Sequence, residues 1–212
     1  MHNSHDRLTH IVEKVREYFV EKHAIREKAL PLTREVIRHS ANAIRAVHRN
    51  EINQAQLLLD TARNLVLEVK NILEDHPDLY FSGYNQDAQK EYVEASAVYS
   101  FIAKTNLPTY EELAVEVAPY LNGLTEAASE LRRYILDSLR RDDDSRSEEL
   151  MEKMDEIYNI MVTMDFPDAL TNGLRRTTDQ LRGVLERTRG DITMTLGQRR
   201  LEHLLSRWNS SN

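Results

Sequence analysis

The chain has 212 residues, 41% of them hydrophobic and 30% charged, a composition that is typical of an ordinary globular protein and excludes collagen and intrinsic disorder. Its six glycines and five prolines are too few for a many-stranded sandwich or barrel, so we expect an all-α fold. The net charge of -7 has the wrong sign for a surface that holds duplex DNA by phosphate contacts alone, and any nucleic-acid site is expected to be local and sheltered.

The absence of cysteine removes disulfides, thiolate zinc sites, iron–sulfur clusters and a cysteine nucleophile. The segment Met1 to His10 is polar and carries His2, His5 and Asp6, so it does not look like a signal peptide. The rest of the sequence contains no run of about eighteen apolar residues, the length that a membrane-spanning helix needs. We therefore expect a soluble, cytoplasmic protein without a membrane segment.

The first predicted helical region runs from Arg7 to Asn50, where apolar residues recur at helical spacing. Pro31 is expected to kink or break it, because proline lacks the amide donor and crowds the preceding turn. Asn50 is expected to cap a second helix, which continues to about Glu74 and is ended by His76-Pro77-Asp78.

The middle of the chain is predicted to hold one long and one short helix. A loop at residues 82–85 precedes the long helix, from about Gln86 to Lys104. Thr109 then caps the short helix, whose first turn carries Glu111 and Glu112.

Four further helices are predicted in the C-terminal half. Pro119 is an early residue of the first, which stops at the acidic run 141–144. The next spans about 150–164, another begins at 165–167, and Gly190-Asp191 separates that one from a last amphipathic helix. About seven helices without an internal repeat or a low-complexity linker indicate that residues 1–212 form a single helical bundle.

The long middle helix carries two glutamates, Glu91 and Glu94, that project from one side of it. On a helical wheel both lie inside an apolar face, because Val98 and Phe101 extend the apolar arc past them. Burying a carboxylate without a partner is costly, so such residues hold a cation, pair with a base or stay protonated. The periodicity alone leaves an arginine partner and a functional site as equally good interpretations.

A second pair, Glu126 and Glu130, lies away from the main apolar stripe of its helix and by itself is typical of solvated residues. Small residues on that side would nevertheless permit close approach of another helix; they are Gly123, Ala127, Ala128 and Ser129. If the two helices pack with these faces together, four carboxylates converge. Such hard oxygen ligands suit Mg²⁺ or Mn²⁺ better than zinc or copper.

Other signals are weaker. None of the eight histidines occurs in the Glu-x-x-His pattern of di-iron bundles, and we expect a surface or capping role for each. Glycine-rich phosphate loops, Gly-x-Ser-x-Gly and His-Glu-x-x-His are absent. Arginines recur along two helical regions, although most helical arginines are merely solvated or paired; these are Arg34, Arg38, Arg45, Arg49, Arg175, Arg176 and Arg182.

An ordered set of short motifs spans roughly residues 34–191. It consists of Arg38-His39-Ser40 with Ile44-Arg45-Ala46-Val47-His48-Arg49, Ser82-Gly83-Tyr84, Glu91-Tyr92-Val93-Glu94-Ala95, Tyr120-Leu121-Asn122-Gly123-Leu124, Glu130-Leu131-Arg132-Arg133, and Leu174-Arg175-Arg176 with Asp179 and Arg182. Taken together, the set resembles the translin family, and especially its translin-associated factor X branch, in a form of archaeal type.

This resemblance implies an all-helical protein that assembles into a hollow octameric shell and binds single-stranded RNA or DNA on its inner surface. A basic interior within an acidic exterior is consistent with the net charge of -7. In this family the factor X subunits carry a metal-dependent endoribonuclease site made of acidic residues from two helices. The Glu-Tyr-Val-Glu-Ala motif is of that catalytic type.

By this resemblance, Glu91 and Glu94 are the two glutamates of the catalytic motif, and Glu130 is the glutamate of the Glu-Leu-x-Arg element. Together with Glu126 they are the expected catalytic metal ligands, one of which would instead orient or deprotonate the attacking water. Glu126 falls where the catalytic branch usually has aspartate, a change that keeps the charge and lengthens the side chain by one methylene. The implied mechanism is in-line attack of an activated water on an RNA phosphodiester. One or two Mg²⁺ or Mn²⁺ ions lower the pKa of the water and neutralise charge on the phosphorus.

Basic side chains on the inner wall would hold the RNA backbone without reading its sequence. The candidates are Arg34, Arg38, Arg45, Arg49, Arg132, Arg133, Arg175 and Arg176. Because the chain carries the catalytic motif and also a translin-like Ile-Arg-x-x-His-Arg element, we expect it to form the shell alone, as a homo-oligomer.

The leading prediction is therefore an Mg²⁺- or Mn²⁺-dependent endoribonuclease that acts on single-stranded RNA. A noncatalytic shell that binds single-stranded RNA or DNA is the nearest alternative, because it needs only the fold and the arginines. A helical scaffold is a third possibility, in which the acids form structural ion pairs with Arg132, Arg175 or other bases and bind no metal.

Overall fold

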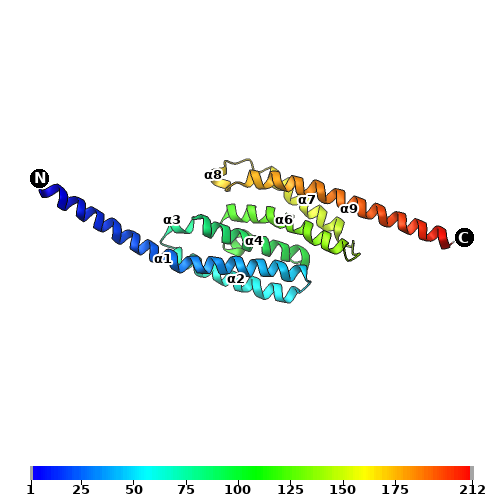
Figure 1. Cartoon of the computed structure of the whole chain (residues 1–212), viewed down its shortest axis with the longest axis horizontal. Helices are drawn as coiled ribbons and strands as arrows, with labels where there is room; N and C mark the ends of the chain where they lie inside the picture. The colour runs from blue at the N-terminus through cyan, green and yellow to red at the C-terminus, as the bar shows by residue number, and fades with distance from the viewer. Residues whose placement is uncertain (1, 211–212) are drawn as a thin grey trace.

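The computed structural model describes the backbone of residues 2–210 and the side chains of residues 6–209, and over that range helices are joined by turns and loops without any strand (Figure 1). The all-α prediction is confirmed. The helices are α1 (His2–His48), α2 (Ile52–Leu73), α3 (Pro77–Tyr80), α4 (Gly83–Ala103), α5 (Tyr110–Leu113), α6 (Val117–Leu139), α7 (Ser147–Val162), α8 (Asp168–Thr171) and α9 (Leu174–Ser210). Met1 and residues 211–212, which the predicted domain includes, lie outside the described residues, and the single domain stays a prediction.

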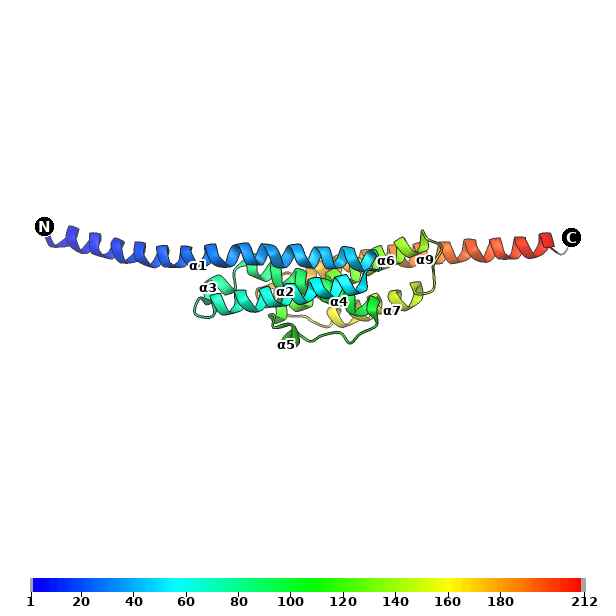
Figure 2. The same cartoon turned by 90° about the horizontal axis from the view of Figure 1, so that it is seen from below.

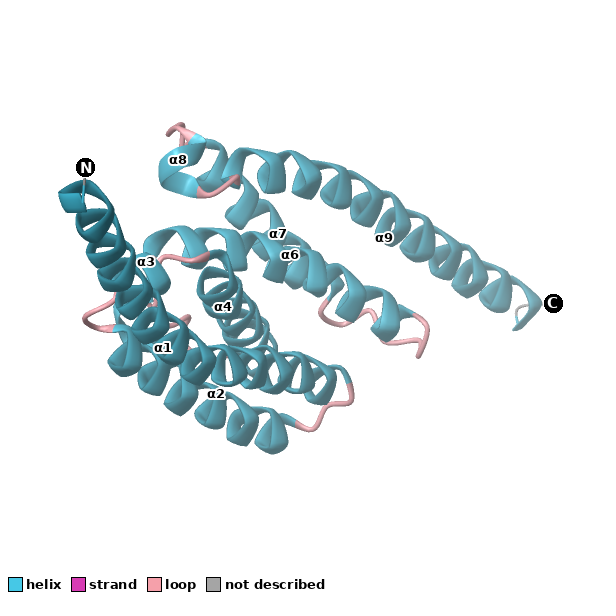
Figure 3. Cartoon of the chain, turned by 60° about the vertical axis from the view of Figure 1, so that its left-hand side comes forward, coloured by secondary structure: helices cyan, strands magenta, loops and turns pink. Residues whose placement is uncertain are grey.

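The long helices pack around α6. On one side α4 contacts α6 and also packs against α1, which in turn lies along α2; on the other side α7 and α9 contact α6 and each other (Figure 3). The main hydrophobic core is built from the facing sides of these helices, with Leu131 and Ile135 of α6 fully buried at its centre. Side chains from α1, α4 and α6 are thereby brought together.

Two predicted helix breaks do not occur, while a kink at Pro31 stays a prediction. Helix α1 continues through Pro31, because its buried face holds it against neighbouring helices on both sides of the proline, at Ala29 and Val36. Pro31 itself is exposed, so water can reach the carbonyl that it leaves unpaired. Helix α9 likewise continues through Gly190, since Ile192 is buried and a glycine inside a helix costs only about 1 kcal/mol.

Several boundaries also differ from the prediction. Asn50 does not cap α2; it has a φ of 61° and follows α1, while Glu51 occupies the cap position of α2. Helix α4 begins at Gly83, inside the predicted loop. Pro77 starts a short helix, α3, and the helix predicted from 165–167 is divided into α8 and α9 by Asn172 and Gly173, which both have positive φ.

The predicted cap of the short helix is confirmed. Thr109 Oγ1 accepts a hydrogen bond from the Glu112 backbone amide, and the Glu112 carboxylate accepts one from the Thr109 amide, which makes a reciprocal capping box at the start of α5. Two unpaired donors are satisfied in this way, which fixes the segment between α4 and α6.

The ends of α1 and α9 extend beyond the packed helices in opposite directions (Figures 1 and 2). Both arms carry large apolar side chains that are 47–78% exposed in this chain. They are Leu8, Ile11, Val12, Val15, Tyr18, Phe19 and Val20 on α1, and Met194, Leu201, Leu204, Leu205 and Trp208 on α9. Within residues 2–210, no helix combines the length and the apolar character needed to cross a bilayer.

Helices α4 and α6 approach each other closely at Gly123. A Cβ placed on this glycine would lie 2.7 Å from the backbone oxygen of Lys90 and 2.7 Å from Cβ of Val93. Ala127 and Ala128, further along α6, are fully buried. The prediction that small residues allow another helix to approach this side of α6 is confirmed, and α4 is that helix.

We expect Gly123→Ala to lower the free energy of unfolding by about 1–3 kcal/mol, because the added methyl overlaps the backbone of α4 and forces the helices apart. Gly190→Ala is the matched control, since its Cβ would meet nothing within 4 Å and alanine favours the helix. Urea denaturation followed by circular dichroism measures both. Equal stability of Gly123→Ala and the wild type would contradict the tight contact.

Candidate metal centre

Three carboxylates from two helices converge beside the contact between α4 and α6. Glu91 and Glu94 on α4 and Glu126 on α6 each offer an oxygen, and these oxygens all lie within 4.8 Å of one another. Glu91 and Glu126 are partly exposed, whereas Glu94 is only 9% exposed. The structure therefore brings together three of the four predicted acids, on the side of α6 that carries Gly123.

A lysine accompanies these acids. Lys90 Nζ donates a hydrogen bond to Glu126 Oε1 at 2.9 Å and lies 3.7 Å from Glu91 Oε1. Burial opposes the charge of Lys90, but the hydrogen bond to Glu126 and the nearby negative charges outweigh it, so its pKa is raised. The sequence indicated an arginine or another base as a partner of the acids and did not single out Lys90. The available signal was that Lys90 is the one basic residue in the α4 sequence and directly precedes Glu91.

The environment of Glu94 disfavours its charge. Burial, followed by repulsion from Glu91, Glu126 and Glu130, raises the pKa of Glu94 to about 8. Burial also raises the pKa of Glu91, against the attraction of Lys90. The cluster thus holds more negative charge than Lys90 offsets. Its donors are hard carboxylate oxygens, which fit a divalent ion such as Mg²⁺ or Mn²⁺.

Glu130 is turned toward α1. Its Oε2 accepts a hydrogen bond from His48 Nε2 at 2.8 Å and lies 3.7 Å from Arg133 Nη1. The hydrogen bond from His48, with smaller contributions from the charges of His48 and Arg133, lowers the pKa of Glu130. This fourth acid stands beside the group of three, near enough for its charge to act on Glu94.

The surface or capping role expected for every histidine is wrong for His48. Its side chain is only 7% exposed, and its other ring nitrogen, Nδ1, lies 3.9 Å from Asp137 Oδ2 without a hydrogen bond. The imidazole therefore joins α1 to α6 at the edge of the acidic cluster. Its place in the Ile-Arg-x-x-His-Arg element was the signal that could have identified it.

The four candidate arginines of α1 share one exposed face. Their spacing places Arg34, Arg38, Arg45 and Arg49 within an arc of about 60°, at 100° per residue. Arg38 pairs with the neighbouring Glu35, Arg45 donates to Asn42 at 2.7 Å, and Arg49 pairs with Glu51 at 2.7 Å. All these partners are local, so the stripe remains open to solvent beside His48.

The other candidate arginines are dispersed. Arg132 bonds to Asp191 at 2.8 Å and to Thr188 at 3.1 Å and so joins α6 to α9; it does not pair with any of the four glutamates, whereas the scaffold alternative required such a pair. Arg133 is exposed next to Glu130. Arg175 and Arg176 are exposed at the start of α9, where Arg175 lines a pocket of about 680 Å³.

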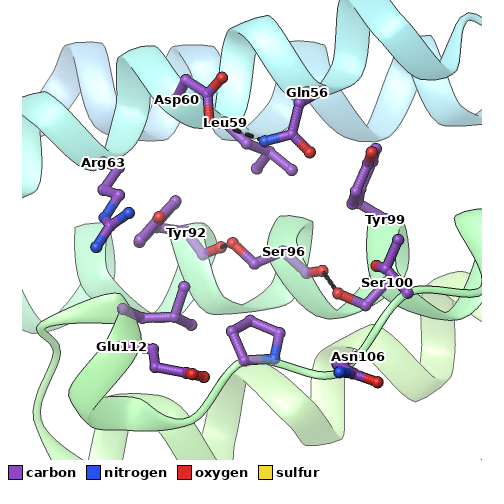
Figure 4. Close-up of a pocket in the computed structure, with 13 residues that line it drawn as sticks. Gln56, Leu59, Asp60, Arg63, Tyr92, Ser96, Tyr99, Ser100, Asn106 and Glu112 are labelled. Atoms are coloured by element: carbon purple, nitrogen blue, oxygen red, sulfur yellow. Dashed lines mark hydrogen bonds between the residues drawn. The ribbon is translucent and has the colours of Figure 1, made fainter.

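A second pocket, of about 460 Å³, lies on the opposite side of α4 from the acids, between α2 and the segment that leads to α5 (Figure 4). Its serines are engaged within the helix, since Ser96 and Ser100 donate to the carbonyls of Tyr92 and Ser96. Tyr92 is buried, which raises its pKa to about 12. None of the four predicted acids lines this pocket.

The pKa of Glu94 predicts a pH dependence of stability in EDTA. Because the folded pKa, about 8, exceeds the unfolded value of 4.5, the unfolded chain loses the proton first as the pH rises. This carboxyl therefore lowers the free energy of unfolding progressively from about pH 4.5 to pH 8. Glu94→Gln should match the wild type near pH 4.5 and exceed it at pH 8, by on the order of a few kcal/mol.

Urea titrations at both pH values measure this difference. Glu68→Gln, at an exposed position on α2, is the control and is expected to follow the wild type throughout. A Glu94→Gln variant that loses stability in parallel with the wild type between pH 5 and 8 would contradict the burial of a destabilised carboxyl.

Comparison with known proteins yields one curated relative and several solved structures. An uncharacterized protein of Methanocaldococcus jannaschii, MJ0175, is 31% identical over 191 residues, which cover 88% of this chain and 84% of that protein. The crystal structure of AfC3PO is similar to this chain, with a TM-score of 0.81 and 36% sequence identity. The match covers 89% of this chain and 98% of the AfC3PO chain. No family model matches the chain.

Two more solved structures extend the comparison. The complex of AfC3PO with duplex RNA has a TM-score of 0.80 at 36% identity, over 89% of this chain and 97% of its own. Apo-NeC3PO has a TM-score of 0.78 at 20% identity, over 87% of this chain and 96% of its own, and shares the fold. C3PO is the complex of translin and translin-associated factor X. The fold, the coverage and the ordered motifs agree, and this chain belongs to the translin family.

Proposed function

We propose that this protein is a metal-dependent endoribonuclease of the translin-associated factor X type, which cleaves single-stranded RNA. The observation that carries the proposal is the convergence of Glu91, Glu94 and Glu126, whose oxygens lie within 4.8 Å of one another although they come from two helices. Carboxylates this close repel one another, and a bound cation would offset that repulsion. We also propose that the chain is a homologue of the archaeal type within this family.

The chemistry of the donor set supports Mg²⁺ or Mn²⁺ as the cofactor. Glu91, Glu94 and Glu126 would hold the ion, and the raised pKa of Glu94 identifies the carboxyl whose negative charge is least compensated by the chain itself. A bound ion of this kind lowers the pKa of water and neutralises charge on a phosphodiester. Glu126 keeps the negative charge of the aspartate usual at its position.

Glu130, the fourth predicted ligand, has the properties of a residue that orients the attacking water. Its hydrogen bond from His48 fixes the carboxylate, and its lowered pKa keeps it ionised, so its oxygens can accept a hydrogen bond from that water. In this arrangement His48, on α1, holds the Glu130 carboxylate in position through that hydrogen bond. The exposed Arg133, 3.7 Å from the same carboxylate, is placed to hold a phosphate at the edge of the site.

RNA binding is proposed from the arginine face of α1 and from the relative that binds RNA. AfC3PO, at 36% identity, has been solved with duplex RNA. Here Arg34, Arg38, Arg45 and Arg49 form an exposed stripe on the helix that also supplies His48, so a phosphate backbone on this stripe runs past the acids. Single-stranded RNA is the proposed substrate, with single-stranded DNA as a further ligand; Arg132, Arg175 and Arg176 are peripheral.

The same proposal includes a homo-oligomeric, octamer-like shell. The apolar side chains of the α1 and α9 arms are exposed in the isolated chain, in continuous rows that a solvated helix does not need. Contacts between copies would bury them and place the RNA face of α1 inside. A cytoplasmic location stays a prediction.

The nuclease proposal is tested with end-labelled single-stranded RNA in the presence of Mg²⁺, Mn²⁺ or EDTA. We expect cleavage only with metal, and a loss of at least about 100-fold in rate for a Glu126→Gln, Glu130→Gln double variant, because the charges that stabilise the transition state are removed. Duplex RNA and single-stranded DNA are included to define the substrate.

The matched control is Glu148→Gln, Glu152→Gln, which neutralises two exposed glutamates with the same spacing on α7. It should cleave like the wild type, and light scattering should show that all variants assemble alike. RNA binding without cleavage under any metal would instead favour the noncatalytic shell, for which the fold and the arginines suffice.

The arginine face is tested by the salt dependence of RNA binding. Each phosphate contact on a single strand contributes about 0.7 to the slope of log affinity against log salt. Arg38→Gln with Arg45→Gln should therefore reduce the slope by roughly 1.4, measured by fluorescence anisotropy in EDTA. Lys70→Gln with Lys104→Gln removes the same charge from exposed positions outside α1, on α2 and just after α4, and it should leave the slope nearly unchanged. An equal effect of the two pairs would refute the α1 face.

A further inference from the structure

We propose that Lys90 is a built-in counter-ion that occupies the carboxylate centre in the absence of metal and is displaced when a divalent cation binds. This inference rests on the proposed function, since it concerns the same three acids. Lys90, which lies outside the family motif, would thereby raise the metal concentration at which the centre is half-occupied. A divalent cation competes with the Lys90 ammonium for the carboxylate oxygens, and Mn²⁺ is the cation used in the test below.

The contacts of Lys90 place its ammonium within the ligand set. It bonds to Glu126 Oε1 at 2.9 Å and lies 3.7 Å from Glu91 Oε1, so it bridges an acid of α6 and an acid of α4. A divalent ion held by the same carboxylates would have to lie close to this ammonium. Two cations so close repel each other strongly, so the two are alternatives.

The side chain is built for such an exchange. Lys90 is 24% exposed at its side chain, so the ammonium stands at the solvent edge of the cluster and its flexible four-carbon stem can turn outward. The backbone of Lys90, in contrast, is fixed, because its carbonyl oxygen is packed against Gly123. The lysine can therefore leave the carboxylates without any movement of the helices that carry them.

Charge accounts for the presence of a lysine at this position. Without it, the partly buried Glu91 and Glu126 would lose the ammonium that lies 3.7 Å from Glu91 Oε1 and 2.9 Å from Glu126 Oε1. The lysine thus stabilises the metal-free centre. The same interaction must be broken before metal binds, so it weakens metal binding by the free energy that it supplies.

The test compares Lys90→Gln with the wild type in a thermal-shift titration with Mn²⁺. We expect Lys90→Gln to melt at a lower temperature than the wild type in EDTA and to reach half of its Mn²⁺-induced shift at a concentration at least tenfold lower. Lys90→Arg, which keeps the charge, should retain a half-saturating concentration near that of the wild type. Electron paramagnetic resonance of free Mn²⁺ measures the same affinities without melting, in case a variant is too unstable for the thermal assay.

The control is Lys104→Gln, which removes another lysine that is paired with a glutamate, Glu149, at 3.0 Å. It is expected to change neither the Mn²⁺ midpoint nor the size of the shift. If wild type and Lys90→Gln bind Mn²⁺ with midpoints within twofold of each other, or the variant binds more weakly, the counter-ion role is wrong while the metal centre stands. If neither protein binds Mn²⁺, the metal centre itself fails, and this inference fails with it.

Discussion

The close contact between α4 and α6 at Gly123 is the constraint on which the rest of the site depends. With the Lys90 carbonyl packed where a β-carbon of residue 123 would lie, the two helices have almost no freedom to shift in register. Three residues along α6 from this glycine, Glu126 then faces Glu91 and Glu94 across the contact. A larger residue at position 123 would widen the gap and separate the acids.

This contact brings negatively charged carboxylates close together, and neighbouring basic side chains compensate some of these carboxylates more than others. Lys90 compensates Glu126 and part of Glu91, and His48 with Arg133 compensates Glu130. Glu94, buried and without a base of its own, retains a pKa of about 8. This imbalance supports the proposed metal centre over a structural ion-pair network, in which each acid would have a basic partner.

The helical periodicity of the chain predicted most of the elements and the buried setting of Glu94. It failed at Pro31 and Gly190, where local breakers were overruled by packing on either side of them. It also assigned Glu126 to solvent, because a helical wheel describes one helix and not the neighbour that covers it. The motif resemblance supplied that pairing instead. It includes His48 but assigned no role to His48 or Lys90, because those roles arise from contacts between helices.

What the sequence by itself determined is the all-α class, the motif glutamates and the small residues of α6, since each follows from local composition and residue spacing. What only the tertiary structure decided is which of these groups meet: that Glu91, Glu94 and Glu126 share one centre, that Glu130 turns to His48, and that Lys90 lies among the acids. The physical reason is that separations of a few ångströms between side chains on α1, α4 and α6 depend on the packing distance and register of whole helices. No local pattern encodes those quantities.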